Sequence, residues 1–215
     1  MRWKNARRSQ NIQHRSSLKG GSIGIAGLAI LLIGWFFGID PQTLLQVVES
    51  GNLSSQNTNQ RQTPNAQYRE LADFTSVILA SSEDIWQPIF AQHNLQYRPT
   101  TLITYDHRVQ SACGINTSAT GPFYCPSDEN IYLDLSFIHQ MQRMGAQGDF
   151  AFAYVIAHEV GHHVQKLLGT LGQAHKAMQS LPKTQANQIS VRIELQADCY
   201  AGIWRTTLPA IALPI

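Results

Sequence analysis

The first 20 residues of this 215-residue chain contain no acidic side chain. They do contain six basic ones: Arg2, Lys4, Arg7, Arg8, Arg15 and Lys19. The rest of the chain has ten basic against fourteen acidic residues, so the net charge of +2 hides an acidic remainder. The basic character therefore belongs to an N-terminal tail, and the stretch that follows argues against a nucleic-acid partner for it.

A second absence is that of any charged or strongly polar side chain in residues 23–39, IGIAGLAILLIGWFFGI. As a helix this run spans about 25 Å, close to the roughly 30 Å of a hydrocarbon core. It lacks an A-x-A-like site, which argues against a cleaved signal peptide, and the preceding positive charges argue against a buried core helix. We therefore expect an uncleaved transmembrane signal anchor at residues 22–39, with the N-terminus cytoplasmic and the rest of the chain across the membrane.

Apolar side chains are nearly absent from residues 50–67, which are rich in Ser, Asn and Gln. Such a segment cannot bury enough surface to fold. The expected organisation is a basic cytoplasmic tail at 1–21, the anchor at 22–39, a flexible polar tether at 40–67 and a folded domain at 68–215.

Within the expected domain, apolar spacing predicts several helices and few strands. Helical periodicity occurs in residues 68–95, 149–168 and 185–204. In the first of these, Ser82 is expected to cap the start of a second helix. Runs rich in β-branched residues predict strands at 100–105 and 131–135, with a loop rich in Gly and Pro between them. The mixture indicates an α+β fold.

Only three cysteines are present, and no second CxxC-like pair accompanies Cys113 and Cys125. A zinc site built on these two residues is therefore disfavoured. On the expected topology they lie in an oxidising compartment, so we expect a disulfide between them, with two free thiols as the alternative. Cys199 is expected to pack as a small buried side chain, with a reactive thiol as the alternative.

The pattern HExxH is present as HEVGH, residues 158–162. On a helix, positions i and i+4 share a face, so His158 and His162 can bind one ion and Glu159 can reach water bound to it. His163 lies one step, about 100°, around the helix from His162 and is expected to be a surface histidine, not a ligand. His175, in an expected loop, has no partner pattern.

A catalytic zinc usually has three protein ligands and one open position, so HExxH supplies only part of a site. The longer pattern HExxHxxGxxH is absent, because Gln165 and Leu168 stand where it needs Gly and His. That absence excludes the metzincin class and directs the search downstream.

The next source of a ligand is ELQAD, residues 194–198, on the last expected helix. Glu194 and Asp198 lie at i and i+4 on one face, and Ala197 is small enough to let this helix approach the first. We expect Glu194 as the third ligand and Asp198 as the acceptor for the outer ring nitrogen of His158. The alternatives are Asp198 as the ligand, or both acids as a solvated face.

HEVGHH followed by ELQADCYAG, with CG…GPFYCP and IYLDLSF earlier in the chain, resembles the bacterial "putative neutral zinc metallopeptidase" family. The basic start, apolar span and polar tether are similar too, so the resemblance covers most of the chain. It implies a zincin-like fold with one Zn²⁺ ion, in which a small sheet offers an edge strand to an extended peptide. We assign that edge to residues 131–135. It also implies a bacterial inner-membrane location with an extracytoplasmic catalytic domain.

The function expected from these residues is zinc-dependent hydrolysis of peptide bonds in a peptide or protein substrate. His158, His162 and Glu194 would hold the ion that activates water, and Glu159 would act as general base. Tyr105 and Tyr132 are candidates for stabilising the oxyanion, although no spacing supports them.

One departure from the family lies after ELQAD. Family members usually continue with a helical segment that bears a His in an FTHG-like motif, whereas this chain ends in RTTLPAIALPI. Two other functions therefore stay open. One is a catalytically impaired zinc-binding scaffold or interaction protein, and the other is a zinc hydrolase that acts on a non-peptide amide.

Overall fold

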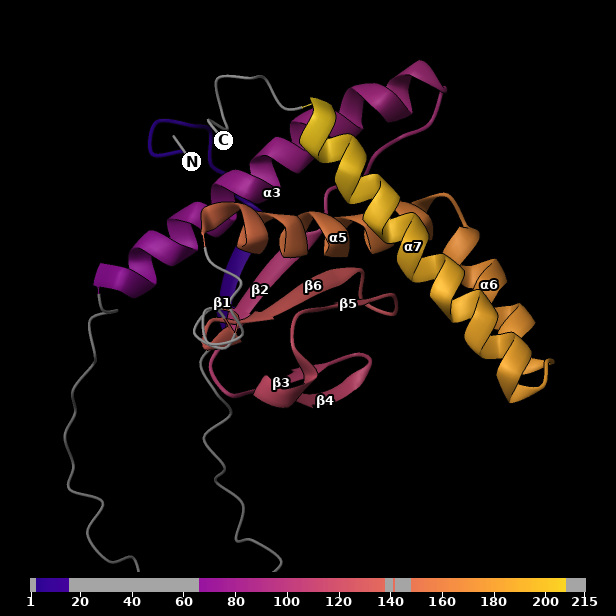
Figure 1. Cartoon of the computed structure of the whole chain (residues 1–215). Helices are drawn as coiled ribbons and strands as arrows, with labels where there is room; N and C mark the ends of the chain where they lie inside the picture. Colours follow the sequence, from indigo (N-terminus) through magenta and orange to yellow (C-terminus); the bar gives the residue numbers. More distant parts are fainter. Residues whose placement is uncertain (1–2, 16–65, 138–140, 142–147, 208–215) are drawn as a thin grey trace, which may run out of the picture. The chain divides into compact units, whose positions relative to one another are not determined.

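The computed structural model describes residues 3–15, 66–137, 141 and 148–207 of the chain. In chain order the elements are β1 (Ile12–Arg15), α3 (Ala66–Gln92), β2 (Thr101–Tyr105), β3 (Arg108–Ser111), β4 (Gly114–Thr117), a 3₁₀ turn (Ser118–Thr120), β5 (Phe123–Cys125), β6 (Asn130–Asp134), α5 (Asp149–Leu167), α6 (Thr170–Gln179) and α7 (Lys183–Thr207). Long helices are thus combined with short strands, and β2, β6, α5 and α7 lie where the sequence predicts strands and helices (Figure 1).

Four strands form one mixed sheet in the order β1–β2–β6–β5. β1, β2 and β6 run parallel, and β5 is antiparallel to β6. Figure 1 shows the long helices on one side of this sheet and the β3–β4 hairpin on the other. Because side chains alternate along a strand, Leu102 and Ile131 join the core under the helices, while Ile103 and Tyr132 pack with Val109 under the hairpin.

The edge of the sheet nearest α5 is β5, not the segment predicted for that role. β6 has β2 on one side and β5 on the other, so the assignment of an edge strand to residues 131–135 is wrong. β5 has only three residues and lies among Gly and Pro, so its sequence carries too little alternation to predict a strand. It contacts α5, the helix that carries HEVGH.

The predicted disulfide between Cys113 and Cys125 is present. It ties the turn between β3 and β4 to the end of β5. The prediction for Cys199 is wrong, because this residue is exposed on α7 and does not pack in the core.

The first residues of the chain belong to the folded body and not to a separate tail. Trp3 is buried and packs edge-on against Phe74 of α3, with ring centroids 5.2 Å apart. β1 then adds a parallel strand to the sheet, with Ile12 opposite Leu102. The folded domain therefore includes residues 3–15 in addition to the part that begins near Tyr68.

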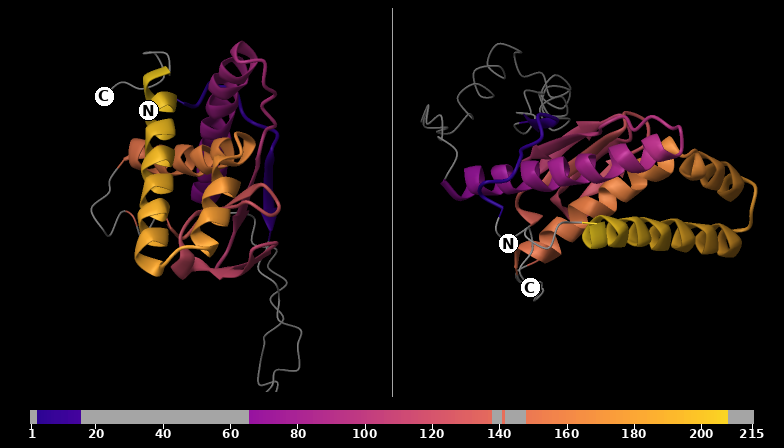
Figure 2. Two further views of the ribbon diagram at one scale, coloured as in Figure 1. Left: turned by 90° about the vertical axis from the view of Figure 1, so that its right-hand side faces the viewer. Right: turned by 90° about the horizontal axis from the view of Figure 1, so that it is seen from above.

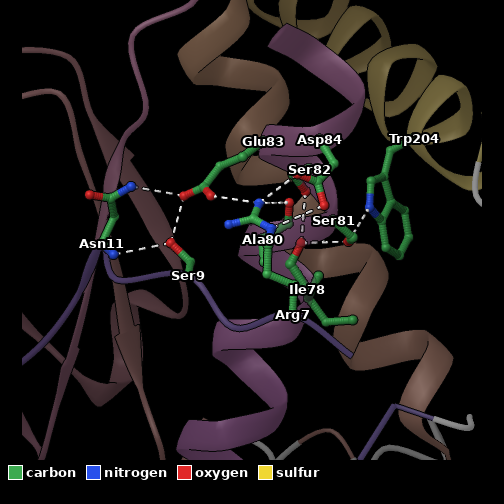
Figure 3. A network of polar contacts seen from close by, with 10 residues as sticks. All are labelled: Arg7, Ser9, Asn11, Ile78, Ala80, Ser81, Ser82, Glu83, Asp84 and Trp204. Carbon is green, nitrogen blue, oxygen red and sulfur yellow. Dashed lines mark hydrogen bonds and ion pairs between the residues drawn. The ribbon is translucent and has the colours of Figure 1, made fainter. Parts of the chain in front are cut away.

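A buried carboxylate on α3 holds this N-terminal segment, as Figure 3 shows. Glu83, whose side chain is 6% exposed, accepts hydrogen bonds from Arg7 (3.0 Å), Ser9 and Asn11 (2.8 Å). Arg7 also pairs with Asp84 at 2.7 Å. We call these five residues the N-terminal clasp. Basic side chains that indicate a tail in the sequence are therefore used inside the fold.

In the described part of the chain, no helix is long and apolar enough to cross a membrane. This finding corrects the predicted fold class, which placed one transmembrane helix before the domain, and the predicted single-pass inner-membrane location. The apolar run at residues 22–39 itself lies outside the described residues. The predicted topology also put the N-terminus and the domain on opposite sides of a membrane, whereas β1 and β2 are neighbours in one sheet.

α3 is one continuous helix, so the prediction that Ser82 starts a second helix is wrong. Its hydroxyl donates to the carbonyl of Ile78 one turn earlier and therefore lies within the helix. The neighbouring Ser81 accepts a hydrogen bond of 2.9 Å from the indole nitrogen of Trp204 on α7. The middle of α3 thus contacts the N-terminal segment on one side and α7 on the other (Figure 3).

Candidate metal centre

The helices α5 and α7 bring three candidate ligands together. The Nε2 atoms of His158 and His162 lie 3.2 Å and 3.4 Å from Oε2 of Glu194. One ligand atom from each residue lies within 4.8 Å of the other two. Two imidazole nitrogens and one carboxylate oxygen form a donor set that suits Zn²⁺ and leaves one position open. We call these three residues the metal centre.

Close contact between the two helices makes this convergence possible. α6 leads away from the end of α5, and α7 then runs back beside α5, as Figures 1 and 2 show. A Cβ atom at Gly161 would lie 2.9 Å from the carbonyl oxygen of Ala197 and 3.1 Å from its Cα. The glycine inside HEVGH therefore permits the backbone of α7 to touch α5. Ala197, which is fully buried, has the small side chain that the sequence analysis required there.

The outer ring nitrogens of both histidines are held by hydrogen bonds, one to α7 and one within α5. Nδ1 of His158 lies 2.9 Å from Oδ1 of Asp198, which also accepts from the hydroxyl of Tyr154 at 3.0 Å. Nδ1 of His162 lies 2.9 Å from Oε1 of Gln165. Because a carboxylate and an amide oxygen can only accept, each Nδ1 carries a proton, and in the neutral ring each Nε2 then presents a lone pair.

Gln165 is a residue of this site that the sequence analysis missed. It is fully buried, and its amide nitrogen donates to the carbonyl of Ile193 (2.7 Å) and to Gln196 (3.0 Å) on α7. One side chain thus orients His162 and fixes the turn of α7 that carries Glu194. One signal in the sequence could have identified Gln165. It is a polar residue three positions after the candidate ligand His162, on a helix face whose other side chains pack in the core.

The sequence-based alternatives for Asp198 and Glu194 differ in their geometry. Asp198 meets the outer nitrogen of His158, on the far side of the ring from Glu194. Glu194 alone of the two acids faces the Nε2 atoms. The carboxylates of both residues are about half exposed, so the site opens toward solvent on the α7 side.

Glu159 lies beside the metal centre in a buried position, with only 7% of the residue exposed. The pKa of its carboxyl group is raised to about 7, mainly by burial; His158 and the backbone of Tyr124 lower this pKa, and nearby Glu194 raises it. A carboxylate with a pKa near neutrality can both take and give a proton. A bound cation would lower this pKa again.

The prediction that His163 is a surface residue is wrong, because it is fully buried. Its Nε2 lies 2.6 Å from the carbonyl oxygen of Arg98, and its Nδ1 lies 3.0 Å from the hydroxyl of Tyr124 on β5. Burial lowers its pKa and favours the neutral ring. His163 is not part of the group formed by His158, His162 and Glu194.

Two other candidates lie away from the centre. Tyr105 and Tyr132 pack in the small core on the hairpin side of the sheet, whereas α5 packs on the opposite side. The hydroxyl of Tyr132 donates to Asp128 at 2.7 Å. Neither residue is placed to stabilise an oxyanion at the metal centre, so these two candidates are withdrawn. His175 lies on α6 and not in a loop.

Comparison with known proteins gives a consistent set of relatives. A sequence model of the family described as "Putative neutral zinc metallopeptidase" matches residues 1–211. The uncharacterized protein YpfJ of Escherichia coli K12 is 41% identical over 218 residues, which cover 95% of this chain and 74% of that protein. The uncharacterized proteins Mb2605 of Mycobacterium bovis and Rv2575 of Mycobacterium tuberculosis are 42% identical over 126 residues, 58% of this chain and 40% of theirs. No solved structure matches the chain.

Proposed function

Because the chain belongs to the family of "putative neutral zinc metallopeptidases", we propose that it hydrolyses peptide bonds at a single zinc ion. The observation that carries this proposal is the convergence of two Nε2 atoms and one carboxylate oxygen beside a buried glutamate. His158, His162 and Glu194 are the proposed ligands, and Glu159 is the proposed general base. Asp198 and Gln165 hold the two imidazoles in the orientation that ligation needs.

The donor set fits zinc on chemical grounds. In both imidazoles Nδ1 is hydrogen-bonded to another side chain, so the Nε2 lone pairs of His158 and His162 face the carboxylate oxygen of Glu194. Three acceptors so close together repel one another unless a cation lies between them. When bound, zinc would lower the pKa of water toward about 7 and polarise the carbonyl of the scissile bond.

Glu159 has the position and the acidity for moving the proton. Its carboxylate takes a proton from the attacking water and delivers it to the nitrogen of the leaving amine. Burial raises the pKa of this carboxyl group to about 7 without the ion, and a bound cation would lower it toward the ionised form that accepts the proton. Its neighbour along the helix, His158, is a proposed ligand, so the base and the ion lie side by side.

β5 supports a peptide as the substrate class. It is the outer strand of the sheet on the side of α5, paired with β6 through Phe123–Cys125. Its outward backbone edge can hydrogen-bond an extended chain, as strand addition does elsewhere. The backbone of Tyr124 in this strand also hydrogen-bonds Glu159, so such a chain would lie next to the base.

The test is Glu159→Gln in the full chain, loaded with zinc and incubated with a mixed peptide library. We expect zinc to remain stoichiometric and turnover to fall about 10²- to 10⁴-fold, the usual contribution of a general base. Glu70→Gln is the matched control, since Glu70 is exposed and pairs with the exposed Lys4, away from the metal centre. Unchanged proteolysis by a zinc-loaded Glu159→Gln protein would contradict the role of Glu159.

A further inference from the structure

Helix α5 has a second functional face besides the one that carries the metal ligands. Glu159 and His163 are four positions apart, so they lie on one face of the helix. Both contact the same residue of β5: the backbone of Tyr124 hydrogen-bonds Glu159, and its hydroxyl lies 3.0 Å from Nδ1 of His163. The run HEVGHH therefore contacts two neighbours: His158 and His162 face α7, whereas Glu159 and His163 face the sheet.

The hydrogen bonds of His163 define which nitrogen carries the proton. The carbonyl of Arg98 can only accept, so Nε2, at 2.6 Å from it, is the donor. In the neutral ring Nδ1 is then an acceptor, and it takes the hydrogen bond from the hydroxyl of Tyr124. The ring also contacts Tyr97 and Tyr124 edge-on, with centroids 5.8 Å and 5.5 Å away. His163 is thus fixed on three sides in the core.

We propose that His163 is a positioning residue that, through the hydroxyl of Tyr124, holds strand β5 against α5 beside Glu159. β5 is short, lies at the edge of the sheet and has β6 as its partner strand. A three-residue strand has few backbone hydrogen bonds to its neighbour. The hydrogen bond between Tyr124 and His163 therefore contributes much to the position of β5 along α5. This inference rests on the proposed peptidase function, because it is an extended peptide that would use the edge of β5.

The proposal makes β5 part of the substrate site without any direct contact between His163 and substrate. If the hydroxyl of Tyr124 is lost, β5 can shift along α5, and its outward edge no longer keeps a constant distance from Glu159. Binding of an extended peptide then weakens in the ground state and in the transition state alike. Such a loss raises KM and leaves kcat nearly unchanged.

The first measurement is amide hydrogen exchange of β5 in the full zinc-loaded chain carrying Tyr124→Phe. We expect exchange in residues 123–125 to accelerate about 3- to 10-fold, the factor that corresponds to one net hydrogen bond. Exchange in α5 and α7 should stay as in the wild type. The matched control is Tyr97→Phe, because Tyr97 touches the same imidazole but its buried hydroxyl makes no hydrogen bond within the described residues.

Two substitutions of His163 separate its two hydrogen bonds. His163→Asn places an acceptor where Nδ1 lies and should keep the bond from Tyr124, whereas His163→Gln places a donor near Nε2 and should keep the bond to Arg98. We expect hydrogen exchange of β5 to be normal in His163→Asn and fast in His163→Gln. Adding Tyr124→Phe to His163→Gln should not accelerate it further. A purely structural role would instead make β5 exchange follow thermal stability in both variants.

Kinetics of the same proteins give the second measurement. We expect KM for an extended peptide to rise about 3- to 10-fold in Tyr124→Phe and His163→Gln, and to stay normal in Tyr97→Phe and His163→Asn. Unchanged β5 exchange in Tyr124→Phe would overturn the positioning role, whatever the activity. If the wild-type protein turns over no peptide while β5 exchange responds as expected, the contact is real, but the peptidase function and the substrate role built on it are overturned.

Discussion

The N-terminal clasp and the metal centre are two clusters built around a glutamate, and they satisfy it in opposite ways. In the clasp, Glu83 is nearly buried and receives hydrogen bonds from Arg7, Ser9 and Asn11. In the metal centre, the carboxylate of Glu194 is 55% exposed and faces two imidazole nitrogens. The clasp combines two carboxylates with several donors, whereas the metal centre combines three acceptors.

This difference separates a structural cluster from a binding one. Donors of the chain itself neutralise Glu83, so the clasp contributes to the free energy of folding without any further component. On the proposed function, the acceptors of the metal centre would be stabilised by a bound cation, so the contribution of the centre to stability would depend on that cation. Mutations in the clasp should therefore change stability, and mutations in the metal centre should change zinc affinity.

The largest effect that separates the two clusters is expected for Glu194→Ala. Loss of a ligand should weaken zinc binding by more than about 100-fold, because even second-layer partners of a metal site contribute 10- to 100-fold. Competition with a chromophoric chelator measures the affinity. The stability of the zinc-free protein should change by less than about 0.5 kcal/mol, since the side chain is half exposed. Stoichiometric, tightly held zinc in this variant would refute the ligand assignment.

The converse result is expected for Glu83→Gln. Removing the charge that pairs with Arg7 should lower the free energy of unfolding by about 1–3 kcal/mol, less than for a fully buried pair because Arg7 is half exposed. Denaturant unfolding measures this change, and zinc affinity should be as in the wild type. Asp84→Asn is the control, since its exposed pair with the same arginine should contribute under about 1 kcal/mol. Lower zinc affinity with unchanged stability in Glu83→Gln would contradict the distinction between a structural cluster and a binding one.

Gly161→Ala should affect both properties, because Gly161 sets the distance between the two helices of the metal centre. The added methyl group would meet the backbone of Ala197, and overpacking of this kind costs about 1–3 kcal/mol. We expect weaker zinc binding together with a lower melting temperature. Gly172→Ala on α6 is the control, since a Cβ there meets nothing within 4 Å and should leave both properties unchanged or slightly raise stability.

The smallest effect is expected for Asp198→Asn. The amide can still accept from His158 but lacks the charge, so zinc affinity should fall about 10-fold with little change in unfolding. Isothermal titration at one fixed pH measures the affinity. Tyr154→Phe removes the other hydrogen bond to this carboxylate and should have a weaker effect in the same direction. Full zinc affinity in Asp198→Asn would exclude a charge-dependent role for this residue.

The sequence was informative wherever the signal is local. His158 and His162, and likewise Glu194 and Asp198, recur at helical spacing, and the structure brings both pairs together. The small side chain of Ala197 also indicated that the two helices can approach each other there. These predictions need only the geometry of one helix and the preference of an ion for several ligands.

Two of the errors concern residues whose partners are distant in the chain. Arg7 binds a helix 76 residues later, and His163 binds a loop 65 residues earlier. Nothing in the neighbours of either residue indicates those contacts, so a basic tail and a surface histidine were the natural predictions. β5 was missed for a related reason, because a three-residue strand is defined by its partner and not by its own pattern.

Strand β1 also has a consequence for the order in which the chain acquires its structure. Its partner Leu102 follows Ile12 by about 90 residues, and at a synthesis rate of roughly 5–20 residues per second that interval is about 5–20 s. β2 and β6, by contrast, are separated by a short stretch. Strand β1 is synthesised before α3 and β2 and must therefore wait for β2 before it finds its partner strand. β1 is therefore fixed late during synthesis, because a nascent chain that stops before residue 105 lacks a complete β2 for β1 to join.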